Sequence, residues 1–275
     1  MKQGLLKKIG WNILAIFVAI IFLAPLYIAF TNSFKTQKGL YLNVLGLPKG
    51  DTFTLDNYIR AFEDLNFFHS FLNSFLITTI STVLIVIFSS MAAWMLVRSK
   101  TKLSKFLFFL FAAAMLIPFQ SVMLPLINIM GKLNLLNPVG LVFMYLGFGS
   151  SLSIIMYHGF IKNIPLELEE AAIIDGCNKF QVFWIIVFPL LKPITVTVSI
   201  LNAMWIWNDF LLPQLVINKP EWQTLPLKMF YFFGEYSKKW NLALAGLVLA
   251  MIPIIVFYFF AQKHIVKGVT QGSIK

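Results

Sequence analysis

The chain has 275 residues, of which 59% are hydrophobic and 12% charged, about half the charged fraction of a typical soluble domain. This composition excludes an ordinary soluble domain, because no stretch between the apolar runs is long enough to bury a core of its own. The net charge of +11 gathers in the loops that flank these runs. Cys177 is the only cysteine, which excludes an intrachain disulfide and a thiolate metal cluster.

Six apolar runs come close to or exceed the ~20 residues that a helix needs to cross a bilayer. The first run could be a signal peptide, but it is longer than the ~7–15 residues of a signal core. We therefore expect an all-α, polytopic membrane protein with six transmembrane helices in a single integral domain, residues 1–275. The expected spans are residues 11–30, 71–97, 106–130, 139–160, 194–217 and 242–261.

Two spans and one loop carry features that predict local structure. Pro118 and Pro125 should kink or unwind the third span. The polar loop 31–69 should contain a short surface helix, since apolar side chains recur at helical spacing after Asp56. The fourth span has a small-residue face suited to close helix packing. This face comprises Gly147, Gly149, Ser150, Ser151 and Ser153.

The segment 163–193 is the longest polar-bearing interruption in the C-terminal half of the chain. Pro165 suits the first turn of a helix, and Gly176 suits its end. The carboxylates between them suit the positive end of the helix dipole. They belong to Glu167, Glu169 and Glu170. The pattern predicts a short helix that ends at the glycine.

A second helix should follow at once, with Asn178 as its cap and Gln181 three residues later. Its apolar residues fall on one face at i, i+3, i+4 and i+7 before Pro189 and Pro193 interrupt the run. These residues are Phe180, Phe183, Trp184 and Val187. Helix geometry alone is equally compatible with a passive, re-entrant or interfacial hairpin that only connects two spans.

Small and charged residues in the first of these helices favour a contact with another protein. Ala171 and Ala172 would let another surface approach closely, while Glu170 and Asp175 offer charge-assisted hydrogen bonds.

The order of residues in this segment is similar to a known motif. Glu170-Ala171-Ala172, three residues, Gly176, nine residues, Ile186, one residue and Phe188-Pro189 resemble the EAA loop of the permease subunits of ABC importers. The usual leucine before the proline is Phe188 here. Pro165 and Glu167 precede the motif as in the carbohydrate-uptake branch.

Two further segments resemble the same branch, the binding-protein-dependent ABC sugar permeases. They are Trp207-Asn208-Asp209-Phe210 and the basic, glycine-bearing tail 262–275. The resemblance implies a type I ABC-importer permease fold in which residues 163–193 form a cytosolic coupling loop. The residues that it implies for contact with an ATPase are Glu170, Ala171, Ala172, Asp175, Gly176 and Pro189.

The resemblance also implies partners. They are a second permease subunit, expected to form a heterodimer with this chain, two cytosolic ATPase subunits and an extracytoplasmic solute-binding protein, all acting at a lipid bilayer and without nucleic acid. The sequence has no P-loop, so we expect ATP to be used by the partner subunits, with no cofactor bound by this chain and no catalysis of its own. The histidines lack metal-ligand spacing. They are His69, His158 and His264.

The fifth span holds the candidates for the translocation path or the permease interface, namely Asn202, Trp205, Asn208 and Asp209. Asp209 is the only acid that adjoins an apolar run, and such groups usually face a cavity or a partner chain. The alternative is an aromatic belt at the membrane surface, with Asn208 and Asp209 as a helix cap.

Two rival functions are testable against these residues. An ion-coupled secondary transporter of a small polar solute would need an intramembrane carboxylate, for which only Asp209 is available. A membrane-embedded enzyme would need converging nucleophile, base or metal ligands, and the sequence offers no such set. The solute stays open between an oligosaccharide, a monosaccharide glycoside, a polyol and glycerol phosphate.

Basic residues indicate the orientation. The densest cluster is Arg98, Lys100, Lys102 and Lys105, and short basic loops face the cytosol. Six spans then place both termini and the coupling loop in the cytosol, in the cell (plasma) membrane of a prokaryote.

Cysteine labelling tests this topology. Native Cys177 should react with a membrane-impermeant maleimide only from the cytosolic side, because it lies in the coupling loop. Asp56→Cys in a Cys177→Ser background should react only from outside. Permeabilised membranes provide the control that both sites are reactive, and labelling of Cys177 from outside would overturn the six-span arrangement.

Overall fold

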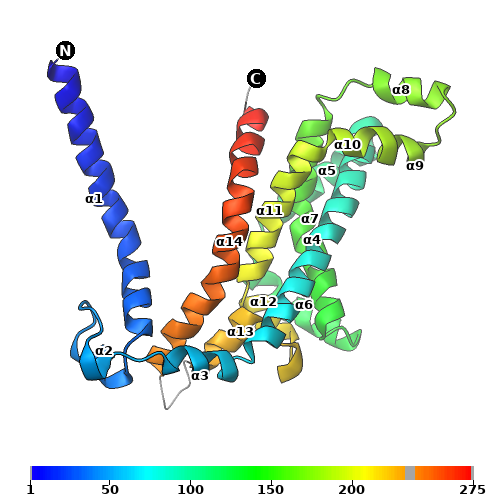
Figure 1. The fold of residues 1–275 in the computed structure, drawn as a ribbon. Coiled ribbons are helices and arrows are strands. Elements are labelled where there is room, and N and C mark those ends of the chain that lie inside the picture. Colours follow the sequence, from blue (N-terminus) through cyan, green and yellow to red (C-terminus); the bar gives the residue numbers. More distant parts are fainter. Residues whose placement is uncertain (1, 233–238, 274–275) are drawn as a thin grey trace. The chain divides into compact units, whose positions relative to one another are not determined.

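The computed structural model describes residues 2–232 and 239–273. Over these residues the secondary structure is helical, and the only extended pairing is an isolated bridge between Lys35 and Phe53. The prediction of an all-α fold is confirmed (Figure 1). Glu235 and Lys238, in the predicted connection before the last span, lie outside the described residues, as do the side chains of the tail 262–275.

The chain packs as two compact units, and each is discontinuous in sequence. Unit 1 comprises Met1–His69 and Leu227–Pro253, and unit 2 comprises Ser70–Pro226 and Ile254–Lys275. The single integral domain expected from the sequence stays a prediction. Three helices contain a boundary between the units, namely α4 (Phe67–Arg98), α13 (Leu225–Met229) and α14 (Trp240–Ser273).

Unit 1 starts with a long apolar helix whose large side chains are mostly exposed, as expected of a surface that lipid covers. The predicted surface helix after Asp56 is present, and it buries Asn57 and Ala61. The further elements wholly within this unit are short. The long helix is α1 (Lys2–Ser33), and the short elements are, in chain order, α2 (Gln37–Leu42), η1 (Gly50–Thr52), α3 (Asp56–Asp64) and η4 (Phe230–Phe232).

A buried lysine closes the loop that follows α1. Lys35 is 2% exposed, and its Nζ donates to Asn32 Oδ1 at 2.9 Å and to the Asn43 carbonyl at 2.6 Å. Burial lowers the pKa of this ammonium group. The Asn57 amide donates to the carbonyls of Ser33 and Lys35. These bonds satisfy backbone carbonyls at the end of α1 and in the loop after it, where no helical partner exists.

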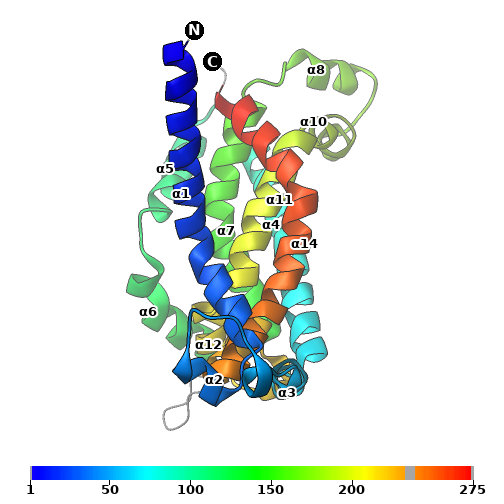
Figure 2. The same ribbon diagram turned by 60° about the vertical axis from the view of Figure 1, so that its left-hand side comes forward.

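Unit 2 contains the packed helical core. Figures 1 and 2 show α4 and two other long helices, α7 and α11, running alongside one another. Its buried apolar cluster draws on these helices and on the segment 163–193. The elements wholly within this unit are α5 (Lys102–Ala114), α6 (Phe119–Lys132), α7 (Pro138–Ile161), α8 (Glu167–Ile174), α9 (Lys179–Gln181), η2 (Val182–Val187), α10 (Phe188–Leu190), α11 (Lys192–Asn208), α12 (Leu211–Val216) and η3 (Pro220–Trp222).

A glycine permits a close approach of helices in this core. A Cβ atom at Gly149 of α7 would lie 2.5 Å from Ile85 Cδ1 of α4 and 2.7 Å from Asn202 Oδ1 of α11. No side chain fits at that spacing, so the glycine lets three helices meet. The predicted small-residue face therefore packs at Gly149, whereas a Cβ atom at Gly147 would meet open space.

Within the residues that the structure describes, four helical segments are long and apolar enough to cross a membrane, and the number rises to six if each of two bent helix pairs is one crossing. The first pair, α5 and α6, meets at 106° just before Pro118, which confirms the predicted break there. Pro125, in contrast, does not end a helix, since α6 continues through it. The second pair joins the segment Lys179–Leu190 to α11 at 79°.

The predicted fifth span, 194–217, is interrupted in the structure. Its helix α11 ends at Asn208, Asp209 is extended, and α12 resumes at Leu211. The helix is interrupted at Asp209, whose carboxylate accepts the Leu211 backbone N–H at 3.0 Å in place of a helical hydrogen bond. The count of six spans stays a prediction.

Candidate functional site

The segment 163–193 folds as a hairpin, here called the α8–α10 hairpin, at one end of unit 2 (Figures 1 and 2). Its first helix, α8, ends in a Schellman motif. The Gly176 N–H donates to the Ile173 carbonyl and the Cys177 N–H to the Ala172 carbonyl, each at 3.0 Å. Gly176 has a φ of +94°, a conformation that side chains disfavour. The predicted stop is confirmed.

The second arm begins with the predicted cap. Asn178 Oδ1 accepts the Gln181 N–H at 2.9 Å, and Gln181 Oε1 accepts the Asn178 N–H at 2.8 Å, which forms a capping box. From Val182 to Val187 the chain is a π-helix. The wider turn puts Phe183 and Phe188 one above the other, with ring centroids 5.8 Å apart.

The predicted apolar face of the second arm is wrong at Phe180, because this arm contains a π-helix. Phe183 and Val187 are fully buried, together with Val182 and Leu191, but Phe180 is 63% exposed. A spacing of 3.6 residues per turn placed Phe180 on the buried face, whereas the π turn takes more residues and rotates it outward.

The prolines also act differently from the prediction. The helix does not stop at Pro189, which lies in the first turn of the short helix α10. The change of direction comes at Leu191, where the segment Lys179–Leu190 meets α11 at 79°. Pro193 then lies in the first turn of α11, a position at which its missing N–H costs nothing.

A buried ion pair anchors α8 to the end of α4. Arg98 Nη2 and Nε lie 2.7 and 2.8 Å from Glu169 Oε1, and Trp94 Nε1 donates to Glu169 Oε2 at 2.9 Å. Arg98 Nη2 also donates to the Ile164 carbonyl at 3.0 Å. The Glu169 side chain is 5% exposed and that of Arg98 19%, so each charge is compensated where water has little access.

Trp94 joins the two arms of the hairpin. Its indole nitrogen binds Glu169 of α8, and its ring packs on Phe183 of η2 with centroids 5.4 Å apart. The same indole therefore contacts both arms, which fixes the hairpin on the last turns of α4.

The outward face of α8 is apolar with charged edges. Ile173 and Ile174 are 53% and 85% exposed, and Glu170, Ala171 and Asp175 are exposed beside them. Ala172 faces the core of unit 2. Of the alanine pair singled out in the sequence, only Ala171 is therefore available to another protein.

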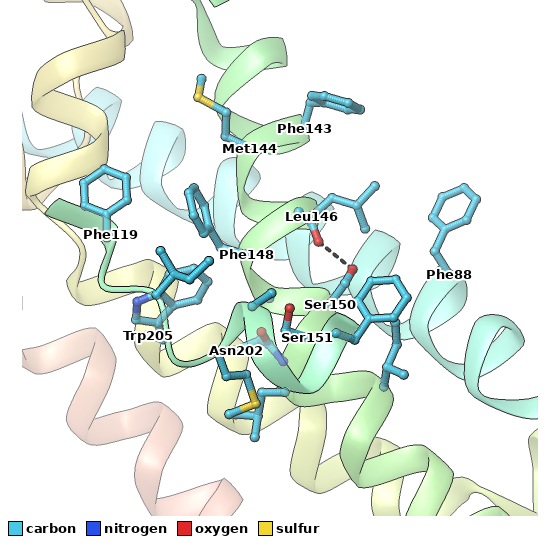
Figure 3. Close-up of a pocket in the computed structure, with 18 of the residues that line it drawn as sticks. Phe88, Phe119, Phe143, Met144, Leu146, Phe148, Ser150, Ser151, Asn202 and Trp205 are labelled. Atoms are coloured by element: carbon cyan, nitrogen blue, oxygen red, sulfur yellow. Dashed lines mark hydrogen bonds between the residues drawn. The ribbon is translucent and has the colours of Figure 1, made fainter. Parts of the chain in front are cut away.

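A pocket of about 1030 Å³ opens in unit 2. Its lining is mostly apolar, and Asn202 and Trp205 of α11 belong to it. Figure 3 shows Trp205, Phe148 and Phe119 toward one side of the view and Phe88 at the other. Trp205 is 43% exposed. The Asn202 amide is committed to Ser153 Oγ at 3.0 Å and the Val198 carbonyl at 2.9 Å.

Asn208 and Asp209 do not line this pocket. Asn208 Nδ2 donates to the Met204 carbonyl of its own helix. Asp209 Oδ2 accepts the hydroxyl of the buried Tyr145 at 2.9 Å, and Oδ1 caps α12. The contacts of Asp209 are those of a helix cap, and a role of either residue on the translocation path stays a prediction. No group of three or more His, Cys, Asp or Glu residues within 2–232 and 239–273 is placed to hold a metal ion.

The contact between Arg98, Trp94 and Glu169 was not predicted from the sequence. A signal was present, since Trp94 and Arg98 are four residues apart on one face of α4, and Glu169 shares a face of α8 with Ala172. Nothing in one sequence says that these two faces meet, because they are about 70 residues apart in the chain.

The chain resembles known proteins along most of its length. Residues 64–271 match the family described as binding-protein-dependent transport system inner membrane component. The chain belongs to this family. The match covers both the α8–α10 hairpin and the pocket, so these are parts of a binding-protein-dependent permease.

Curated relatives extend the similarity to the whole chain. The probable starch degradation products transport system permease protein AmyC of Thermoanaerobacterium thermosulfurigenes is 49% identical over 100% of both chains. The melibiose/raffinose/stachyose import permease protein MelC of Bacillus subtilis is 37% identical over 96% of this chain and 95% of its own.

A solved structure supports the fold. A bacterial ABC transporter involved in the import of the acidic polysaccharide alginate has a chain with a TM-score of 0.81 and 23% identity, which covers 96% of this chain and 98% of its own. The fold is therefore that of a type I ABC-importer permease. The family match and the relatives identify the chain as a permease subunit of such an importer and not as an ion-coupled transporter. The protein is a multi-pass membrane permease subunit that works with other importer components and a solute-binding protein, and hydrolysis of ATP belongs to the partner ATPase.

Substitutions of Asp209 distinguish a helix cap from a charge that acts on the translocation path. Asp209→Asn should assemble and transport like the wild type, because an amide can still accept from Leu211 and pair with Tyr145. Asp209→Ala should lose about 1–3 kcal/mol of stability, since two polar groups lose their partner. Thermal inactivation of the purified complex and solute uptake measure these effects. Loss of uptake in Asp209→Asn at normal assembly would contradict the cap.

Proposed function

We propose that this permease subunit couples solute import to ATP hydrolysis through the α8–α10 hairpin, with Glu170, Ala171, Asp175 and Gly176 at the contact with a cytosolic ATPase. One observation carries the proposal, namely the two-sided construction of α8. Its inner face is anchored by the buried Glu169, while its outer face exposes Ile173 and Ile174. An exposed apolar surface with a charged rim is typical of a protein–protein contact.

The proposed topology places the hairpin and both termini in the cytosol. The basic cluster that starts at Arg98 is tied to the hairpin through Glu169, so the hairpin and the densest group of positive charges lie at the same end of unit 2. Short basic loops face the cytosol. We place the subunit in the plasma membrane of a prokaryote on these grounds.

The partners proposed are a second permease, forming a heterodimer with this chain, and two ATPase subunits that bind the nucleotide. This chain would then bind no cofactor. Closure of the ATPases would move the hairpin as a lever, and the packed helices would switch between inward-open and outward-open states rather than deform continuously.

The solute proposed is an oligosaccharide, on the basis of relatives that are named for starch degradation products and for melibiose, raffinose and stachyose. The pocket adds a physical argument, because the ring of Trp205 is partly exposed in it and aromatic faces pack on the apolar C–H faces of sugars. Asn202 would shape the pocket wall instead of binding the sugar, since its amide N–H groups are already bonded.

Substitutions in the hairpin test the coupling. Glu170→Lys and Gly176→Val should leave an inserted, assembled subunit, because the first changes an exposed charge and the second costs about 1 kcal/mol or more of local strain. Both should lower solute-stimulated ATPase activity and uptake in reconstituted vesicles. Glu167→Lys, an exposed change at the start of the same helix, is the matched control. Normal coupling in both variants would show that the hairpin is a passive connection.

Uptake assays test the solute. Vesicles with the complete complex and its binding protein should accumulate labelled maltotriose or raffinose when ATP is present inside, and should not accumulate sorbitol or glycerol 3-phosphate. Trp205→Ala should reduce uptake more than Trp205→Phe, since phenylalanine retains an aromatic face. Accumulation of sorbitol or glycerol 3-phosphate alone would contradict an oligosaccharide importer.

A further inference from the structure

The hairpin is attached to three helices of unit 2, but to only two of them through the chain. It continues from α7 at one end and into α11 at the other. Its attachment to α4 is made by side chains, and the polar part of it consists of Glu169, Arg98 and Trp94, with the Ile164 carbonyl. Any motion of the hairpin must therefore reach α4 through packing or through this set of contacts.

The geometry of the contact is directional. Glu169 Oε1 accepts from two nitrogens of Arg98, and Oε2 accepts from the indole nitrogen of Trp94. Arg98 spans two points, because the same Nη2 that binds Glu169 also binds the carbonyl of Ile164, ahead of α8. The guanidinium thus holds both the helix and the chain that enters it, which a single point charge would not do.

Apolar packing already holds the hairpin on the core. Ala172, Val182 and Phe183 are buried against neighbouring helices. A buried ion pair adds little to stability that apolar residues of similar size would not provide. It differs from apolar packing in another way, since packed helices can slide past one another by small steps, whereas a hydrogen-bonded pair with two fixed ends resists displacement.

We propose that Glu169 and Arg98 are positioning residues that make α4 follow the hairpin during transport. The inference rests on the proposed function of the hairpin as the ATPase contact. The adjacent glutamates then have separate tasks. Glu170 faces the ATPase, and Glu169 passes the resulting movement to the end of α4.

The test replaces the pair by apolar residues of similar size, Arg98→Met with Glu169→Leu. The double variant retains the packing and leaves no unpaired charge. We expect normal assembly, substantial ATPase activity stimulated by the binding protein, and at least about fivefold less solute imported per ATP, the lower end of ordinary coupling between two sites. Lys102→Met with Glu167→Leu removes the same charges from exposed positions of the same region, and should import normally.

A purely structural role predicts another result. Single substitutions would then reduce the amount of assembled complex, and the double variant would restore both assembly and import per ATP to wild-type values. That outcome would overturn the proposal. If the double variant does not assemble, Arg98→Lys decides, because lysine retains the charge but lacks the planar fork. A lower import per ATP supports the link, and an unchanged value overturns it.

The failure of this inference is distinguishable from failure of the proposed function. If the hairpin is not the ATPase contact, Glu170→Lys and Gly176→Val also couple normally. If only the link to α4 is wrong, those two variants lose coupling while the double variant retains it.

Discussion

The hydrocarbon interior of a membrane provides no hydrogen-bond partner for the polypeptide backbone, and this constraint governs where the helices of this permease break. At each break in a helix, nearby groups of the chain form hydrogen bonds with the freed backbone groups. Between α5 and α6, the N–H groups of Leu116 and Ile117 bond to the carbonyls of Ala113 and Ala114. After α11, the Asp209 carboxylate takes the Leu211 N–H.

Sequence reasoning predicted those features of the hairpin that depend on neighbouring residues. Gly176 and Asn178 end and begin helices through contacts within five residues, so one sequence contains the information. The break at Pro118 was predictable for the same reason. The apolar face of the second arm was not, because a π turn has no simple signature and the assumed period placed Phe180 on the buried side.

Contacts between segments that are far apart in the chain could not be predicted from one sequence. The pairing of Arg98 with Glu169, and of Tyr145 with Asp209, joins residues 71 and 64 positions apart. The family resemblance drew attention to Glu170 and passed over its neighbour. Successive residues of a helix are turned by about 100°, which is why one glutamate is exposed and the next one back is buried among Arg98, Trp94 and Ala172. A motif written as letters does not distinguish the two.

Because Val182–Val187 is a π-helix, the number of residues in this segment determines how the outward face of α8 is oriented. Such a turn contains one residue more than an α-helical turn. Removal of any single residue there would let the segment relax into an α-helix and rotate everything on the N-terminal side by about 100° about the helix axis. The outward face of α8 would then point elsewhere, although every side chain that forms it would be unchanged. Substitutions in this stretch change the packing of side chains, whereas insertions and deletions would redirect the surface that we propose as the ATPase contact.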